Sequence, residues 1–422
     1  MIDFIKSFFD RFKDSLYYFG SSLIMLPIAL FTTPIFARNL SAYDFSAIGY
    51  FGALMQIFTP LLSLSFYSYY MVDYHKRTDN ENQKVLSSLV SFLLLSNIFI
   101  ILFGYLGILL YLKLSNSEFS AYPLGLIVLV TGYFAIGKGF WLLKLRFDKK
   151  AFDYFIISTI SALIGIGLGI LFVSLFKMGA AGKLIPLALI EIIAMIIFLR
   201  KYLVSLKFDM KIIRNAFLLG LPIILESLLN LPVLAFDRLV VEKINNVNEF
   251  ALYNIGFSFS GYLFTFGSSL LMAFEPEVFK MISYGHKKDV IKMFFGFVFI
   301  MLFVNTSFLL VSKPMINFLT AGRYSGSVLY ANNFIFSQSL LLFTYFIGFI
   351  ATALRLTRIE LIIKIFISLL SIFLIISLVG KYSFMGAIYA KYITYGLWAF
   401  LLSLALYYRK TPFIKYFQVI EK

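Results

Sequence analysis

The sequence predicts an all-α integral membrane protein with twelve transmembrane helices, in two six-helix lobes related by a parallel pseudo-two-fold repeat. Three observations carry this prediction: the composition, the spacing of the apolar stretches and an internal repeat. Of the 422 residues, 61% are hydrophobic and only 14% are charged, and the mean hydropathy is +0.90. These values lie outside the range of water-soluble globular domains, so soluble classes of protein are excluded.

The apolar stretches have the length of membrane-crossing helices, which need about 20 residues. We predict twelve spans at 15–37, 45–71, 86–112, 120–143, 154–176, 182–199, 216–236, 250–274, 290–311, 328–354, 360–380 and 384–408. Lys and Arg concentrate in every second polar segment, beginning with the N-terminal one. Because positively charged segments stay on the cytoplasmic side, both termini are predicted to be cytoplasmic. No cleavable signal peptide is expected.

The same pattern divides the chain into parts. Residues 1–14 place Ile and Phe at helical spacing among charged residues, which predicts an interfacial amphipathic helix. Residues 15–199 form the predicted N-lobe, the basic segment 200–215 a cytoplasmic linker between lobes, 216–408 the C-lobe and 409–422 a cytoplasmic tail. Prolines within or at the ends of the first, second and seventh spans are expected to bend them: Pro27, Pro34, Pro60, Pro222 and Pro232.

An internal repeat supports the two lobes. Short matches recur in chain order about 200 residues apart: Arg38 with Arg238, Asp44-Phe45 with Glu249-Phe250, and His75-Lys76-Arg77 with His286-Lys287-Lys288. Both halves start on the cytoplasmic side, so the repeat is parallel and its axis runs along the membrane normal. A substrate path between the lobes is expected.

Several kinds of chemistry are excluded or disfavoured. The chain has no cysteine, so disulfides and Cys-ligated metals are excluded. His75 and His286 lie in predicted loops without ligand spacing around them, so no metal site is predicted. The polar segments are too short for a soluble catalytic domain. We therefore predict no catalytic residue, no resident cofactor and no nucleic-acid partner.

Ionisable residues inside the spans are the candidates for function, because each costs about 2.5–3.5 kcal/mol near the centre of the bilayer. They are Lys138, Lys364, Lys391, Glu191 and Glu226. Lys138 and Lys364 are close enough to the cytoplasmic end to snorkel. For the others, two interpretations stay open. One is a structural ion pair between helices, and the other is a solvated cavity in which lysines attract an anion and a glutamate binds a coupling ion.

The chain resembles the O-antigen (Wzx-type) polysaccharide flippases of the multidrug/oligosaccharidyl-lipid/polysaccharide exporter superfamily. The resemblance spans nearly the whole chain. The residues that carry it are Pro34-Ile35-Phe36-Ala37-Arg38-Asn39-Leu40, Asp44-Phe45, Gly49, Gly220-Leu221-Pro222, Asp237-Arg238, Tyr253-Asn254 and Gly386-Ala387-Ile388-Tyr389-Ala390.

The resemblance implies a V-shaped pair of lobes that open alternately to the two sides of the bacterial inner membrane. Such a protein moves undecaprenyl-diphosphate-linked O-antigen or polysaccharide repeat units, as used in lipopolysaccharide synthesis, to the outer leaflet. A cationic central cavity is implied, for which the candidates are Lys391, Lys138, Lys364, Arg38 and Arg238. Coupling to an H+ or Na+ gradient is implied, with Glu226, Glu191 and Thr394 as candidates. The alternative that a glutamate and a lysine pair with each other, in place of a bound sodium ion, stays open. Further implied partners are membrane lipids, a polysaccharide polymerase and a chain-length regulator.

Two other functions were weighed. A multidrug or cation antiporter of the same superfamily is the closest alternative, and it would favour an acidic cavity for cationic drugs. A membrane glycosyltransferase or polysaccharide polymerase would need an extended outer loop or an acidic catalytic motif. The short polar segments contain neither.

Overall fold

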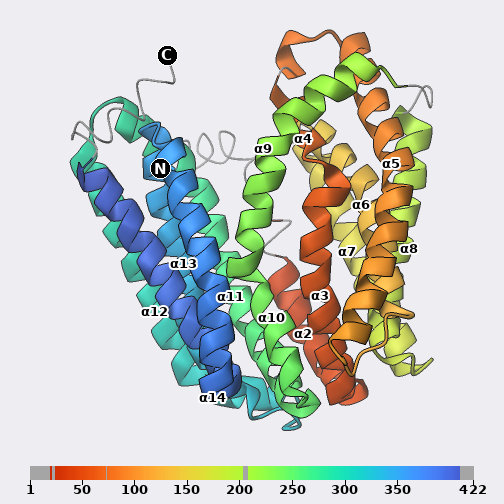
Figure 1. The fold of residues 1–422 in the computed structure, drawn as a ribbon, viewed down its shortest axis with the longest axis vertical. Helices are drawn as coiled ribbons and strands as arrows, with labels where there is room; N and C mark the ends of the chain where they lie inside the picture. The colour runs from red at the N-terminus through yellow and green to blue at the C-terminus, as the bar shows by residue number, and fades with distance from the viewer. Residues whose placement is uncertain (1–19, 21–23, 73, 203–207, 409–422) are drawn as a thin grey trace, which may run out of the picture. The chain divides into compact units, whose positions relative to one another are not determined.

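The computed structural model describes residues 20, 24–72, 74–202 and 208–408, and these residues form helices and turns without a strand. The predicted interfacial helix at 1–14 and the predicted tail at 409–422 lie outside them. The helices are α2 (Met25–Asn39), α3 (Ala42–Ser63), α4 (Phe66–Val72), η1 (Tyr74–Lys76), α5 (Asp79–Leu114), α6 (Leu124–Phe147), α7 (Ala151–Ser174), α8 (Gly179–Tyr202), α9 (Met210–Leu234), α10 (Phe236–Val241), η2 (Glu242–Ile244), α11 (Val247–Ser283), α12 (Lys287–Leu319), α13 (Ser327–Ala353) and α14 (Thr357–Tyr408) (Figure 1).

These helices account for the predicted spans. Ten of the described helices are long and apolar enough to cross a membrane, and α2 covers the described part of the first span. The helix α14 contains the last two spans. Ser383 has non-helical dihedral angles (φ 54°, ψ −139°) and divides the helix between them. A Cβ atom at Gly386 would lie 2.0 Å from the carbonyl oxygen of Leu378, so the two halves meet in a tight turn. The all-α, multi-pass membrane fold is confirmed.

Local capping explains where equivalent helices of the two halves begin. At the start of α3, Ser41 accepts a hydrogen bond from the backbone N–H of Asp44, and the Asp44 carboxylate accepts one from Ser41 in return. At the start of α11, Asn246 caps Glu249 by the same three-residue spacing. Such caps satisfy the free N–H groups of a first turn. Asp44 and Glu249, which the repeat pairs, therefore stand at the same position after a capping residue, although the Glu249 carboxylate accepts a hydrogen bond from Tyr330 instead.

The second predicted span, 45–71, is broken. Leu64 (φ 46°) and Ser65 (φ 51°) adopt the left-handed conformation and separate α3 from α4. Pro60, one turn earlier, removes a helix hydrogen bond. The Asn97 side chain donates to the carbonyl oxygen of Leu62 at 2.8 Å. Gly220 packs so closely that a Cβ there would lie 2.5 Å from the carbonyl oxygen of Leu64. We call this interruption the α3/α4 break.

The chain forms two compact units, Met1–Leu228 (unit 1) and Leu229–Lys422 (unit 2). The division falls inside α9. The segment 200–215, predicted as a linker, is helical up to Tyr202 and again from Met210. Ile213 and Ala216 of α9 are buried in the core of unit 1. The first part of α9 therefore belongs with the N-terminal helices.

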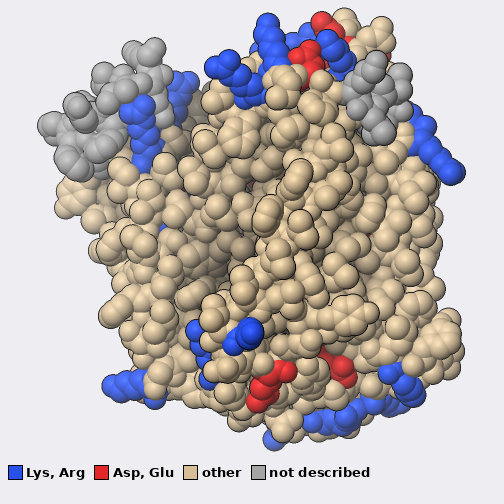
Figure 2. Space-filling model, turned by 45° about the vertical axis from the view of Figure 1, so that its right-hand side comes forward, with Lys and Arg blue, Asp and Glu red and all other residues tan. Residues whose placement is uncertain are grey.

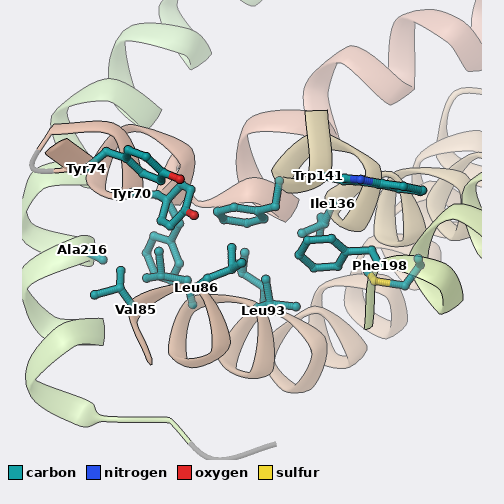
Figure 3. Close-up of a cluster of buried hydrophobic side chains, with 14 of the residues drawn as sticks. Tyr70, Tyr74, Val85, Leu86, Leu93, Ile136, Trp141, Phe198 and Ala216 are labelled. Atoms are coloured by element: carbon teal, nitrogen blue, oxygen red, sulfur yellow. The ribbon is translucent and has the colours of Figure 1, made fainter. Parts of the chain in front are cut away.

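The core of unit 1 is rich in aromatic residues and draws side chains from α4, α5, α6, α8 and α9. Figure 3 shows Trp141 and Ile136 of α6 beside Phe198 of α8, with Leu86 and Leu93 of α5 below them. In a bilayer such close packing, more than exclusion from water, holds helices together. This core sets the relative position of α6 and α8, which both carry candidate charges.

In unit 2, α13 is the most buried of the long helices. In its most apolar stretch, 67% of the residues are buried. One apolar cluster joins Val233 at the end of α9 to Ile367, Tyr395 and Trp398 of α14. In the space-filling view, Lys and Arg gather toward the two ends of the helices, and the band between them is mostly uncharged (Figure 2). The few charges buried within that band need a structural explanation.

Candidate functional site

The strongest candidate site lies in unit 2, where the seventh predicted span is interrupted. The helix α9 ends at Leu234 and α10 starts at Phe236, with Ala235 non-helical between them (φ −130°, ψ −18°). We call this the α9/α10 break. A helix end leaves its last carbonyl groups without intrahelical partners. In a membrane those groups need other donors.

Side chains of α14 supply the donors. The hydroxyl of Ser371 donates to the carbonyl oxygen of Pro232 at 3.0 Å, and that of Tyr395 donates to Val233 at 3.1 Å. The ammonium group of Lys391 donates to the carbonyl oxygens of Val233 and Leu234 at 3.4 and 3.3 Å. These three side chains all belong to α14, so that helix holds the backbone at the break.

Lys391 also forms an ion pair with Asp237, in the first turn of α10. Its Nζ lies 3.1 Å from Oδ1 of Asp237, and the two side chains are 3% and 0% exposed. The hydroxyl of Tyr253 donates to Oδ2 of the same carboxylate. A buried charge is tolerated only when it is paired and hydrogen-bonded. Asp237 and Lys391, which we call the break-site pair, meet this condition.

Two further predicted residues lie at the same place. Arg238 is 3% exposed, and its guanidinium carbon lies 3.9 Å from the centre of the Phe257 ring, a cation–π contact. Thr394 follows Lys391 by three residues and so shares its helix face. It is fully buried, and within the described part of the chain its hydroxyl has no hydrogen-bond partner. The break thus gathers one carboxylate oxygen and two carbonyl oxygens around the ammonium group of Lys391.

A second ion pair lies in unit 1. Lys138 of α6 and Glu191 of α8 are in contact, with side chains 24% and 12% exposed. We call them the interhelix pair. The structure thus brings Lys138 and Glu191 together as an ion pair between two helices, and an ion pair is the first of the two interpretations left open for Glu191. Among the described residues, Oε2 of Glu191 has no hydrogen-bond partner.

The remaining candidates are Lys364, Arg38 and Glu226. Lys364 is 7% exposed, with its ammonium group 5.8 Å from the centre of the Trp398 ring. Arg38 is exposed near the end of α2, and Glu226 is exposed on α9. Glu226 belongs to unit 1 and Lys391 to unit 2. The carboxylate that pairs with Lys391 is Asp237.

Asp237 was missed as a site residue by reasoning from the sequence, which used it only as part of a motif. Hydropathy ends the seventh span at residue 236, so Asp237 was assigned to an outer loop. In the structure the chain continues as α10, and Asp237, Leu239 and Val241 are all buried. Pro232 lies just before the break, and it was the one signal in the sequence that the chain bends there.

The structural comparisons identify the fold. No protein-family model and no curated protein matches the sequence. The lipid II flippase MurJ, in an inward closed conformation, matches with 19% identity and a TM-score of 0.69, over 93% of this chain and 87% of that one. An inward-facing multidrug resistance MATE family transporter of the MOP superfamily matches with 13% identity and a TM-score of 0.71, over 93% and 96%.

A MOP superfamily transporter from Pyrococcus furiosus is a third match, with 12% identity and a TM-score of 0.56, over 94% and 95% of the two chains. The likeness covers nearly all of this chain in each case. It shows that the chain has the fold found in MurJ and in MATE transporters of the MOP superfamily. The structures that it resembles are those of transporters and flippases.

Proposed function

We propose that this protein is a flippase for lipid-linked oligosaccharide in the bacterial inner membrane, with both termini cytoplasmic. Its substrate is undecaprenyl-diphosphate-linked O-antigen or polysaccharide repeat units, which it moves from the cytoplasmic to the outer leaflet by alternating access. The fold, shared with a flippase and with other transporters, supports a transport function. The choice of an anionic substrate depends on the buried charges.

The balance of buried charge in unit 2 is the observation that carries this choice. Among the described residues, the buried cations there are Arg238, Lys364 and Lys391, and the buried carboxylates are Asp237 and Glu242. An excess of buried cations suits a diphosphate, because phosphate oxygens in a low-dielectric site need Lys or Arg partners. A site for cationic drugs would show the opposite excess.

Deletion of the gene tests the proposal. Lipid-linked repeat units should accumulate in the cytoplasmic leaflet of the deletion strain, and surface polysaccharide should be lost. A plasmid carrying the gene should restore both. Normal surface polysaccharide in the deletion strain would contradict the proposal. Glycosyltransferase and polymerase genes next to this gene would support the same pathway and its partners.

A multidrug or cation antiporter is the second candidate, because the match to a MATE transporter has a TM-score of 0.71. The same deletion strain separates the two. An antiporter predicts increased sensitivity to cationic drugs with unchanged polysaccharide. A flippase predicts the reverse.

The cations are expected to contribute unequally. Lys391→Ala should impair flipping more than Lys364→Ala, since Lys391 holds both Asp237 and the carbonyl groups at the α9/α10 break. The assay is complementation of the deletion strain, with protein levels measured in parallel. Equal activity of both variants and the parent would show that neither lysine binds substrate.

Coupling to an H+ or Na+ gradient is the remaining part of the proposal, with Glu226 and Glu191 as candidate groups. Glu226→Gln removes the charge while keeping the size of the side chain. Normal protein levels with lost transport would support a coupling role for Glu226. Lost protein would indicate packing instead.

A further inference from the structure

We infer that the α9/α10 break is an internal cation site whose resident cation is the ammonium group of Lys391, so that it takes no free Na+ or K+. The proposed function assigns coupling to Glu226 and Glu191 and says nothing of an ion at this break. Three oxygen atoms lie around Nζ of Lys391. These are Oδ1 of Asp237 at 3.1 Å and the carbonyl oxygens of Leu234 and Val233 at 3.3 and 3.4 Å.

The donor set has the chemistry of a cation site. A carboxylate and two carbonyl groups freed by a helix break are all oxygen ligands, which hard metal cations prefer. In secondary transporters, the carbonyl groups of a broken helix are a common place for a coupling ion. Thr394, one turn after Lys391 in α14, is buried, and in the part of the chain that the structure describes its hydroxyl has no hydrogen-bond partner.

The residues present do not fit a free ion, however. Lys391 brings a positive charge to the carboxylate that a metal cation would use, and its side chain is only 3% exposed. Two cations on one carboxylate in a low-dielectric environment would repel strongly. Arg238, also 3% exposed, adds a further cation next to Asp237 along the chain. The tethered ammonium group therefore replaces the mobile ion.

Removal of the ammonium group should convert the break into a binding site. In Lys391→Ala, the carboxylate and the two carbonyl groups would face a space left by a long side chain. Na+ or K+ entering that space would restore the balance of charge. Binding to the folded state alone raises the unfolding temperature in a saturable way.

The experiment compares unfolding temperatures of detergent-purified protein in NaCl, KCl or choline chloride at equal ionic strength. The parent should unfold at the same temperature in all three salts. Lys391→Ala should be stabilised by Na+ or K+ in a saturable way, and the double variant Asp237→Asn/Lys391→Ala should lose that response. Lys364→Ala, which removes another buried lysine of unit 2, is the matched control and should unfold at the same temperature in all three salts.

Two outcomes would overturn the inference. Stabilisation of the parent by Na+ or K+, beyond the effect of choline, would show that a free ion binds beside Lys391. A folded Lys391→Ala protein with no response to either ion would show that these oxygens do not form a cation site. If Lys391→Ala does not fold, Lys391→Ser keeps a polar group against Asp237 and is read in the same way. The parent measurement needs no variant. It also does not depend on which substrate is flipped, so failure of the proposed function leaves it interpretable.

Discussion

Units 1 and 2 each contain an ion pair and an interrupted predicted span, but only in unit 2 do the two features coincide. In unit 1, neutral groups hold the α3/α4 break: the amide of Asn97 donates to the Leu62 carbonyl, and Gly220 permits close approach to Leu64. The interhelix pair lies elsewhere, between the unbroken helices α6 and α8. In unit 2, the break-site pair is itself part of the α9/α10 break.

The difference in exposure has an energetic consequence. The side chains of the interhelix pair are 24% and 12% exposed, and those of the break-site pair are 3% and 0% exposed. A charge that keeps some exposure can recover part of its solvation when its partner is lost. A fully buried charge cannot, so the cost of breaking a pair rises with burial. The interhelix pair thus joins two helices, whereas the break-site pair holds a broken backbone together.

The largest effect is expected from Lys391→Met, which leaves the Asp237 carboxylate buried without its cation. We expect a loss of about 3–5 kcal/mol in the free energy of unfolding. Thermal unfolding should be measured in choline chloride, so that no small cation substitutes for the ammonium group. The double variant Asp237→Asn/Lys391→Met, which removes both charges, should lose much less. A double variant as unstable as the single one would mean that packing, and not charge, dominates at the break.

A smaller effect is expected from Gly220→Ala, which tests the neutral break in unit 1. The new Cβ would lie 2.5 Å from the carbonyl oxygen of Leu64, so backbone must move. We expect a loss of about 1–3 kcal/mol, as for other overpacked sites. Gly261→Ala, in α11, is the control because a Cβ there meets nothing within 4 Å. Equal unfolding temperatures for the two variants would show that close approach at the α3/α4 break is not needed.

Lys138→Met tests the interhelix pair. It leaves Glu191 beside a methionine, but with enough exposure to lower the penalty, so we expect a loss of about 1–2 kcal/mol. Lys138→Arg keeps the charge and should recover most of the stability. If Lys138→Met were as damaging as Lys391→Met under the same conditions, the link between burial and cost drawn above would be wrong.

The smallest effect is expected at an exposed pair, Lys84 and Asp209, where the charged atoms are 3.3 Å apart and the side chains are 68% and 35% exposed. The backbone N–H of Lys211, and then the Lys84 side chain, lower the pKa of Asp209. A lowered pKa stabilises the fold above the ordinary pKa of aspartate, and the effect is lost as the pH falls through the folded-state value. The small difference in unfolding temperature between the parent and Asp209→Asn should therefore vanish in acid. A difference that grows in acid would contradict this sign.

Much of the architecture follows from composition and local spacing. The apolar stretches predicted the spans, because a bilayer demands helices of a given length whatever their neighbours are. In the structure, Ser41 and Asn246 cap the starts of α3 and α11, and such caps are local because they involve only residues a few positions apart. The candidate lysines were also found in this way, because a charge within an apolar stretch is visible in the sequence.

Local reasoning could not find the partners of those charges or the breaks. Hydropathy averages over a span, so it treated residues 45–71 as one helix and ended the seventh span before Asp237. The break at Leu64 and Ser65 depends on contacts from Asn97 and Gly220, which are distant in the chain. Pro60 and Pro232 signalled bending without showing what would satisfy the freed carbonyl groups.

Composition and the spacing of the apolar stretches are enough to predict that this chain crosses a membrane many times and carries a few charges within its spans. The pairing of Lys391 with Asp237 at a helix break, and of Lys138 with Glu191 between intact helices, depends on tertiary packing. The two kinds of interaction differ in range. Burial in lipid acts on each segment separately, whereas an ion pair or a hydrogen bond needs two groups within about 3 Å. Which groups come that close depends on how the helices pack.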